Sequence, residues 1–196
     1  MSNLETLIAK IEKLSPAGLT LLAEYVEFLS WREQVQSQAE DTQMWSYSFI
    51  ETFGEATVAA SGNPAGMDVT MAPATVGDDT RPALWAHPPV SGRTTIEYYV
   101  PVPQQVRDLK LKTAIGIRDG AKIAKTNLVA FNIKVNGLRV WGMQTNRQTW
   151  QPVEIPIRVT TGDIVRFTFT TEALGSHQWT WAVWGNPELV GSTNTA

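Results

Sequence analysis

The chain has 196 residues, of which 43% are apolar and 18% charged, and its net charge is −3. This composition excludes a disordered protein, and the absence of cysteine excludes disulfides, thiol chemistry and cysteine-based zinc sites. No run of about 18 apolar residues occurs, so we expect no membrane span, and the acidic balance argues against a nucleic-acid partner. The N-terminus lacks a secretion signal, so we expect a cytoplasmic protein or part of an assembled particle.

Residues 1–40 form the first predicted domain, an α-helical hairpin, because their apolar residues recur at helical spacing. Ser15 and Pro16 divide the hairpin, since serine is a preferred N-cap and proline suits the first helical position. The second helix is predicted from about Pro16 to about Gln36. The polar, glutamine-rich residues 34–44 are predicted to be the helix end and a linker.

The second helix has an apolar face that is wider than the first helix can cover. A 40-residue hairpin is too small to be stable alone, so this face needs a partner surface. That partner is either the rest of the same chain or a second copy, and we predict a homo-oligomer. The residues that we assign to oligomerisation are Leu19, Leu22, Tyr25, Val26, Phe28 and Leu29.

The segment KIEKLSPAGLTLLAEYVEFLSWRE, residues 10–33, resembles a helical domain of unknown function in small bacterial antitoxin-like proteins. That domain has a leucine-rich helix, a Ser/Pro turn and a second helix that ends in a VEFL-like run. The resemblance implies a bacterial or phage origin and a role in protein association. It does not imply antitoxin activity, because no DNA-binding strand module precedes the helices.

Residues 41–196 form the second predicted domain, in which apolar residues alternate with a period of two. Asn136-Gly137 joins two such runs and is a strong hairpin signal. Pro152 and Pro156 place their strand at a sheet edge, and the last strand, Trp179–Trp184, is predicted to stop at Gly185-Asn186-Pro187. Eight or nine half-polar strands, with few clear ones in residues 54–79, predict an antiparallel jelly-roll β-sandwich.

Several segments between residues 83 and 190 follow the order seen in galactose-binding-like jelly rolls, especially the NPCBM-like carbohydrate-binding modules of bacterial proteins. These segments are ALWAHPP, IEYYVPVP, GIRDGA, VAFNIKVNG, WQPVEIPI, TTGDIVRFTFTTE and WAVWGNPELV. The resemblance implies the fold and a carbohydrate-like ligand. The shared residues are mostly framework, and we match no side-chain set in them to a sugar site.

Tryptophan is the main candidate for ligand contact, because eight occur and seven lie in the second domain. Trp141 shares the expected face of Arg139, which predicts an exposed Trp beside an Arg, and Trp150 follows a polar loop. Trp179 and Trp181 stand two residues apart and would share one face of the last strand, whereas Trp184 would lie on the opposite face. One of these two faces is therefore expected to point outward.

Basic residues are the second candidates for ligand contact. Arg118 and Lys122 lie in one loop and suit an acidic glycan or the carboxylates of a protein partner. The alternative for both is a solvated loop.

The resemblance also leaves open a structural calcium ion with oxygen ligands. Asp68, Asp78 and Asp79 are the candidate donors, because they lie in the loop-rich stretch. We favour turn residues over ligands at these positions, since Asp is typical of turns and no calcium-loop spacing is present. We therefore predict no metal or cofactor.

No nucleophile–base pattern is visible, so we predict that the protein is not an enzyme. A hydrolase would have to draw on His87 with Asp119 or Glu97. The predicted function is a non-catalytic binding module, an oligomerised jelly roll that recognises a carbohydrate-like or protein ligand. The alternative is a structural assembly protein, such as a decoration or attachment component of a phage or other particle.

Overall fold

A computed structural model describes residues 5, 8, 11–12, 14–40 and 42–194, and the chain divides into a helical unit that ends at Gln43 and a β-unit, Met44–Asn194. In the helical unit, α2 (Pro16–Glu40) begins as predicted, because the Ser15 hydroxyl accepts a hydrogen bond from the Gly18 amide at 3.2 Å. Within the described residues, no helix is long and apolar enough to cross a membrane.

The predicted linker is wrong, because α2 continues to Glu40 and β1 begins at Thr42. The first predicted helix lies largely outside the described residues, although Glu5, Ile8 and Ile11 have helical backbone. The hairpin, and the independence of domains 1–40 and 41–196, stay predictions.

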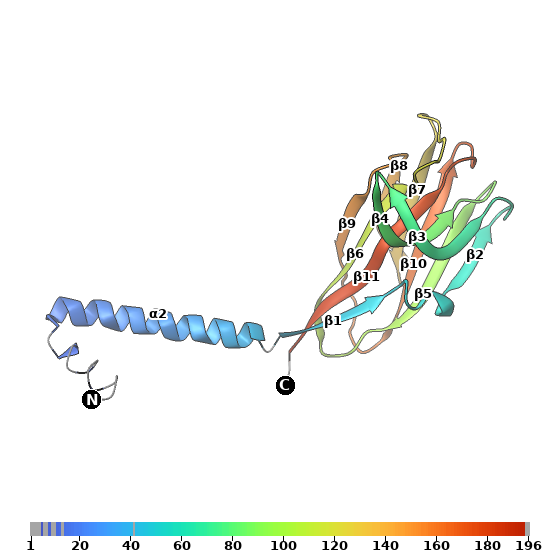
Figure 1. The fold of residues 1–196 in the computed structure, drawn as a ribbon. Coiled ribbons are helices and arrows are strands. Elements are labelled where there is room, and N and C mark those ends of the chain that lie inside the picture. Colours follow the sequence, from blue (N-terminus) through green and yellow to red (C-terminus); the bar gives the residue numbers. More distant parts are fainter. Residues whose placement is uncertain (1–4, 6–7, 9–10, 13, 41, 195–196) are drawn as a thin grey trace. The chain divides into compact units, whose positions relative to one another are not determined.

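The β-unit is an antiparallel jelly-roll sandwich of two sheets, as the sequence predicted (Figure 1). The six-stranded sheet contains β1 (Thr42–Ser48), β3 (Asp68–Val76), β4 (Asp79–His87), β6 (Val106–Ile117), β9 (Gln151–Pro156) and β11 (Ala182–Asn194). The five-stranded sheet contains β2 (Thr57–Ser61), β5 (Arg93–Pro101), β7 (Leu128–Val135), β8 (Leu138–Thr145) and β10 (Ile164–Leu174). A short 3₁₀ helix, Phe53–Glu55, precedes β2.

The strand orders are β3-β4-β11-β6-β9, with β1 also paired to β11, and β2-β5-β10-β7-β8. The strand with Pro152 and Pro156 is β9, which lies at an edge as predicted, since proline cannot donate to a ladder. The described residues form eleven strands. The strands β3 and β4 are longer than expected, because their pairing is continuous from Asp68 and His87 to Val76 and Asp79.

The predicted end of the last strand is wrong. Asn186 adopts a φ of 44° and the register shifts between Gly185 and Glu188, so Gly185-Asn186-Pro187 forms a bulge. The strand β11 then continues to Asn194. At the bulge, β11 also contacts the residue that follows β1. The Pro187 carbonyl accepts a hydrogen bond from the Phe49 amide at 3.1 Å.

The core between the sheets is built on edge-to-face aromatic contacts. Phe49 lies 4.9 Å from both Tyr98 and Phe169 between ring centroids, and Trp184 lies 5.1 Å from Phe131 and 5.2 Å from Phe169. All of these rings are at most 1% exposed. Such pairs stabilise a fold beyond the area that they bury, so this cluster fixes how the two sheets stack.

Candidate functional site

The outer face of the six-stranded sheet carries a row of chemically active side chains. The β3–β4 register places Asp68 opposite His87, and the β4–β11 register places Trp85 opposite Val183. Side chains two residues apart on a strand share a face, so Trp181 lies beside His87, with a ring-centroid distance of 6.3 Å.

The next strand, β6, adds a cation to this row. The Arg118 amide directly after β6 donates a hydrogen bond to the Trp181 carbonyl at 3.0 Å. The guanidinium carbon of Arg118 lies 3.4 Å from the centroid of Trp85 and 5.3 Å from that of Trp181. Arginine above an aromatic face is a favourable cation–π contact. Four adjacent strands therefore bring these residues together, although they are far apart in sequence.

His87 completes the stack as a neutral, buried ring. Its plane is within 17° of Trp85 and within 15° of Trp181. Burial lowers the pKa of His87 to about 4; the Asp68 carboxylate, 3.7 Å from Nδ1, opposes this shift, and Arg118 adds to it. The imidazole is therefore uncharged at pH 7. Neither its Nε2 nor the Trp85 Nε1 has a hydrogen-bond partner among the described residues.

Trp179 extends the stack toward solvent. Its ring centroid lies 5.2 Å from that of Trp181, its side chain is 40% exposed, and the Lys122 ammonium lies 5.7 Å from its centroid. Its φ is 64°, which is a strained conformation for a bulky residue and is typical of functional sites.

A tight turn holds the Trp179 backbone in this conformation. The Thr180 hydroxyl donates to the His177 carbonyl at 2.5 Å, and the Thr180 amide donates to the same oxygen at 3.3 Å. Thr180 itself is buried. The turn therefore presents the Trp179 ring from a fixed position. We name Trp85, His87, Arg118, Lys122, Trp179 and Trp181 the tryptophan–arginine site.

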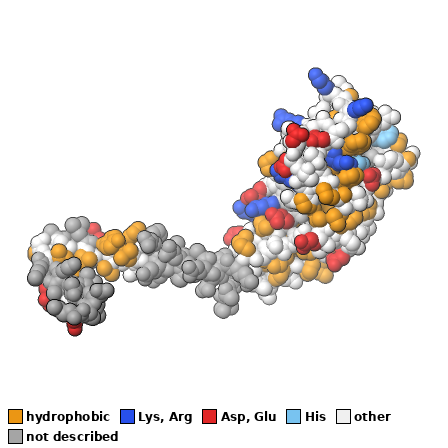
Figure 2. Space-filling model, viewed as in Figure 1, with side chains coloured by type: hydrophobic (Ala, Val, Ile, Leu, Met, Phe, Trp, Pro, Cys, Tyr) orange, Lys and Arg blue, Asp and Glu red, His pale blue; other side chains and the backbone are white. Residues whose placement is uncertain are grey.

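The two cations of the tryptophan–arginine site form no ion pair within 4.0 Å with a carboxylate of the described residues, although the Asp68 charge acts on Arg118 from a greater distance. The nearest acid in sequence, Asp119, is engaged elsewhere, because its carboxylate accepts the Gly77 and Asp78 amides at 2.9 and 3.1 Å. Asp119 thereby clamps the β3–β4 turn. Figure 2 shows basic and apolar side chains next to one another on the sandwich.

Of the predicted ligand residues, only Arg118 and Lys122 meet at this site. The prediction that Trp141 shares the exposed face of Arg139 is wrong, because the β7–β8 register shifts between them. Trp141 lies opposite Ile133 and contacts the core Trp184 at 6.2 Å. Both residues still line a hollow of about 750 Å³ along β7 and β8, and a ligand role for them stays a prediction.

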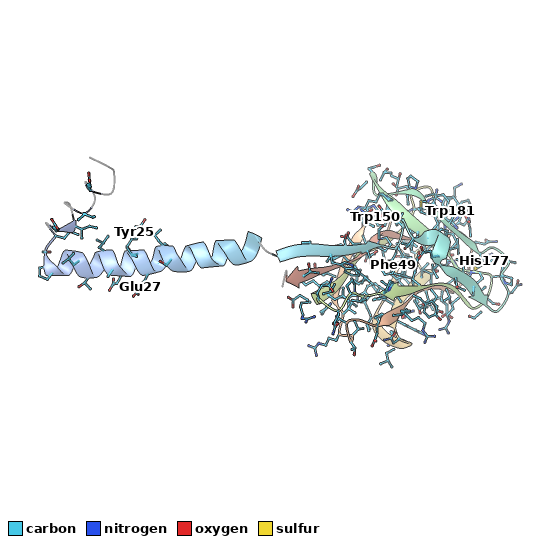
Figure 3. The ribbon with its side chains drawn as sticks, turned by 90° about the horizontal axis from the view of Figure 1, so that it is seen from below. Tyr25, Glu27, Phe49, Trp150, His177 and Trp181 are labelled. Carbon is cyan, nitrogen blue, oxygen red and sulfur yellow. The ribbon has the colours of Figure 1, made fainter. Side chains whose placement is uncertain are left out.

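Trp150 stands directly before β9 and makes structural contacts there, and a ligand role for it stays a prediction. Its Nε1 donates to the Asp79 carbonyl at 2.9 Å, and it packs on the small apolar cluster that includes Val183. A Cβ at Gly185 would lie 2.8 Å from the Trp150 ring, so only glycine fits there. Figure 3 shows Trp150 and Trp181 on the same side of the sandwich.

The three candidate calcium ligands do not come together. Asp68 lies beside His87, Asp78 is in the β3–β4 turn with a φ of 64°, and Asp79 pairs with Arg81 at 2.6 Å. In the part of the chain that the structure describes, no group of three His, Asp or Glu side chains could hold a metal ion.

The hydrolase candidates are also separated. Glu97 belongs to the other sheet, where its carboxylate accepts hydrogen bonds from Tyr99 at 3.0 Å and Thr168 at 3.3 Å. Asp119 is held by backbone amides, and His87 is stacked between two indoles. These residues therefore form no nucleophile–base pair with one another.

A hollow of about 910 Å³ lies at the opposite end of the sandwich, near the start of β6. Its lining is chiefly aliphatic, with Val106, Leu138 and Ile157 among its residues, and it includes no aromatic ring. It offers no flat surface for a sugar ring, so the tryptophan–arginine site is the stronger candidate.

Trp85, Trp179 and Trp181, the central residues of this candidate site, were not among the residues predicted to contact a ligand. A signal was present, because Trp85 with His87 and Trp179 with Trp181 each stand two residues apart and thus share a strand face. The pattern did not say that the two pairs lie on neighbouring strands.

No protein-family model and no curated protein matches this sequence. Solved structures do resemble the sandwich. The CBM51 module from Clostridium perfringens GH95, in complex with methyl-galactose, has a TM-score of 0.53 at 14% identity, with 74% of this chain and 99% of that chain covered.

Two further structures are similar. The tandem CBM51 modules of Sp3GH98, the family 98 glycoside hydrolase from Streptococcus pneumoniae, give a TM-score of 0.55 at 13% identity, covering 79% of this chain and 49% of theirs. The CBM51-2 and INT domains of Clostridium perfringens ZmpB, in complex with GlcNAc, give a TM-score of 0.50 at 12% identity, with 69% of this chain and 29% of that chain covered. The chain thus has the jelly-roll fold of carbohydrate-binding modules, as the resemblance of residues 83–190 predicted.

Proposed function

We propose that the protein is a non-catalytic binding module that recognises a carbohydrate at the tryptophan–arginine site. The observation that carries this proposal is Trp179, an exposed indole held in a left-handed backbone conformation beside Trp181. Strained backbone conformations of this kind cluster at functional sites, where the surrounding structure holds them in place. The fold shared with carbohydrate-binding modules supports the proposal by analogy.

The chemistry of the site suits a sugar ring. An indole presents a flat apolar face that covers the C–H face of a pyranose. The Arg118 and Lys122 side chains supply N–H donors, and the Asp68 carboxylate supplies an acceptor, half exposed beside His87. A few polar groups around an aromatic surface are the usual arrangement of a small-ligand site.

We expect Trp179→Asn to abolish glycan binding while leaving the fold stable. Asn tolerates a positive φ, so relief of backbone strain offsets the lost contact with Trp181, and the free energy of unfolding changes by less than about 1 kcal/mol. Binding is measured with the full-length protein on a glycan array, and stability by urea denaturation.

The matched control is Arg139→Ala, which alters the other candidate surface along β8. Binding that is lost with Arg139→Ala and kept with Trp179→Asn would place the ligand on β8 and contradict our proposal. A blank array with folded wild-type protein would favour the assembly protein, whose contact is made with another protein.

We further propose that α2 gathers copies of the chain, so that several weak sugar contacts act together. The α2 side chains of Leu19, Tyr25 and Val26 are 44%, 58% and 52% exposed. Phe28 is 49% exposed, and Leu22 and Leu29 are half-buried. Leu19, Leu22, Val26 and Leu29 have the spacing of a coiled-coil seam.

We expect Val26→Lys to lower the oligomeric mass, because a charge in an apolar seam opposes association. The control Thr20→Lys adds the same charge on the polar side of α2, near Glu24 and Glu27, and should leave the mass unchanged. Light scattering on the full chain measures both. An equal mass for wild type and Val26→Lys would rule out α2 as the association surface.

A further inference from the structure

We propose that the ligand is an anionic carbohydrate, a sugar that carries a carboxylate, and that Arg118 and Lys122 bind this group. The inference rests on the proposed function and adds the charge of the ligand to it. The Arg118 guanidinium carbon lies 3.4 Å from the centroid of Trp85, and the Lys122 ammonium lies 5.7 Å from the centroid of Trp179, the exposed indole that would stack the ring.

The two carboxylates near the site contact groups other than its cations. Residues 118–127 contain Arg118, Lys122 and Lys125 but one acid, Asp119. The Asp119 carboxylate is satisfied by the Gly77 and Asp78 amides. Asp68, the other nearby acid, faces His87 at 3.7 Å. Neither Arg118 nor Lys122 forms an ion pair within 4.0 Å with a carboxylate of the described residues.

Arg118 is the more informative of the two cations. It is partly buried, and burial lowers its pKa while the Asp68 carboxylate opposes this shift, so the charged form is less well solvated than on an open surface. Its guanidinium has no hydrogen bond to any described residue, while its face is in contact with Trp85. Stacking uses the face of a guanidinium and leaves its edge of N–H donors for bidentate binding of a carboxylate.

Lys122 complements this arrangement from the solvent side. An ammonium is a mobile point charge with three donors, which adapts to a carboxylate beside a ring stacked on Trp179. A neutral hexose uses these donors only as ordinary hydrogen-bond partners. A uronic or sialic acid forms charge-assisted bonds with them, which are about twice as strong.

The test compares matched sugars by calorimetry on the full-length protein. The pairs are methyl galactoside with methyl galacturonide, methyl glucoside with methyl glucuronide, and lactose with sialyllactose; the last pair distinguishes a sialic acid from a uronic acid. In at least one pair we expect the acidic sugar to bind about tenfold tighter, a difference of about 1.4 kcal/mol. Added salt should reduce that preference.

Lys122→Gln should weaken binding of the acidic sugar by more than it weakens binding of the neutral sugar, so that most of the preference is lost. Lys125→Gln, at a neighbouring exposed lysine outside the site, should leave the preference unchanged. Equal affinity for both members of each pair that binds would overturn the inference and leave the proposed function standing. A folded protein that binds no member of any pair would contradict the proposed function, and this inference with it.

Discussion

Replacement of Trp184 by alanine should destabilise the protein by about 3–5 kcal/mol, as is typical of a large buried aromatic side chain. Trp184 is fully buried, and its ring lies within 5.2 Å of Phe131 and Phe169 and 6.2 Å from Trp141. The variant leaves a cavity between the sheets that these rings cannot fill. Urea denaturation followed by circular dichroism measures the loss.

Trp184→Phe is the matched control. Phenylalanine keeps an aromatic edge against Phe131 and removes the indole N–H, which has no hydrogen-bond partner among the described residues. We expect this variant to lose less than half as much stability as the alanine variant. If Trp184→Ala cost under about 1 kcal/mol, the indole would be at the surface, and the arrangement of the core would have to be revised.

Acid should destabilise the protein through His87 as the pH falls from about 6.5 to about 4. The pKa of His87 is lowered from 6.5 to about 4 in the folded protein because the ring is buried. Between these values the unfolded chain binds a proton that the folded chain does not, so stability falls as the pH falls. The total loss is about 3 kcal/mol, from 1.36 kcal/mol for each pKa unit, and it is complete below pH 4.

Two variants isolate this effect from the carboxylates that titrate in the same range. His87→Gln cannot take up the proton, so its stability should fall less steeply than that of the wild type between about pH 6.5 and pH 4. Asp68→Asn removes the negative charge that opposes the lowering of the His87 pKa. The pH range over which stability is lost should therefore extend to lower pH in this variant. Parallel pH profiles for wild type and His87→Gln, from urea titrations at pH 4 to 7.5, would show that His87 is solvated.

Local sequence signals predicted much of the fold. Alternation identified strands such as β5, β7 and β9, because each of these has one face in the core. The Asn136-Gly137 turn, with φ of 50° and 86°, joins β7 and β8 as predicted. Ser15 and Pro16 set the start of α2. Each of these signals acts between residues that are neighbours in the chain.

Bulges account for the clearest errors. A shift of one residue moves a side chain to the other face of a strand, which is why Trp141 turns toward Trp184 while Arg139 does not. A bulge also lets β11 continue past Gly185-Asn186-Pro187, although glycine, asparagine and proline are residues typical of a turn. A bulge depends on the partner strand, so the sequence of one strand does not reveal it.

The sequence by itself determined the fold class, the order of its strands along the chain, and a residue inventory rich in tryptophan and poor in catalytic pairs. Tertiary structure alone decided which residues meet, because the order of strands in a sheet follows from long-range pairing. The row of Asp68, His87, Trp181 and Arg118 exists because β3, β4, β11 and β6 are adjacent in that order. No local pattern contains that adjacency.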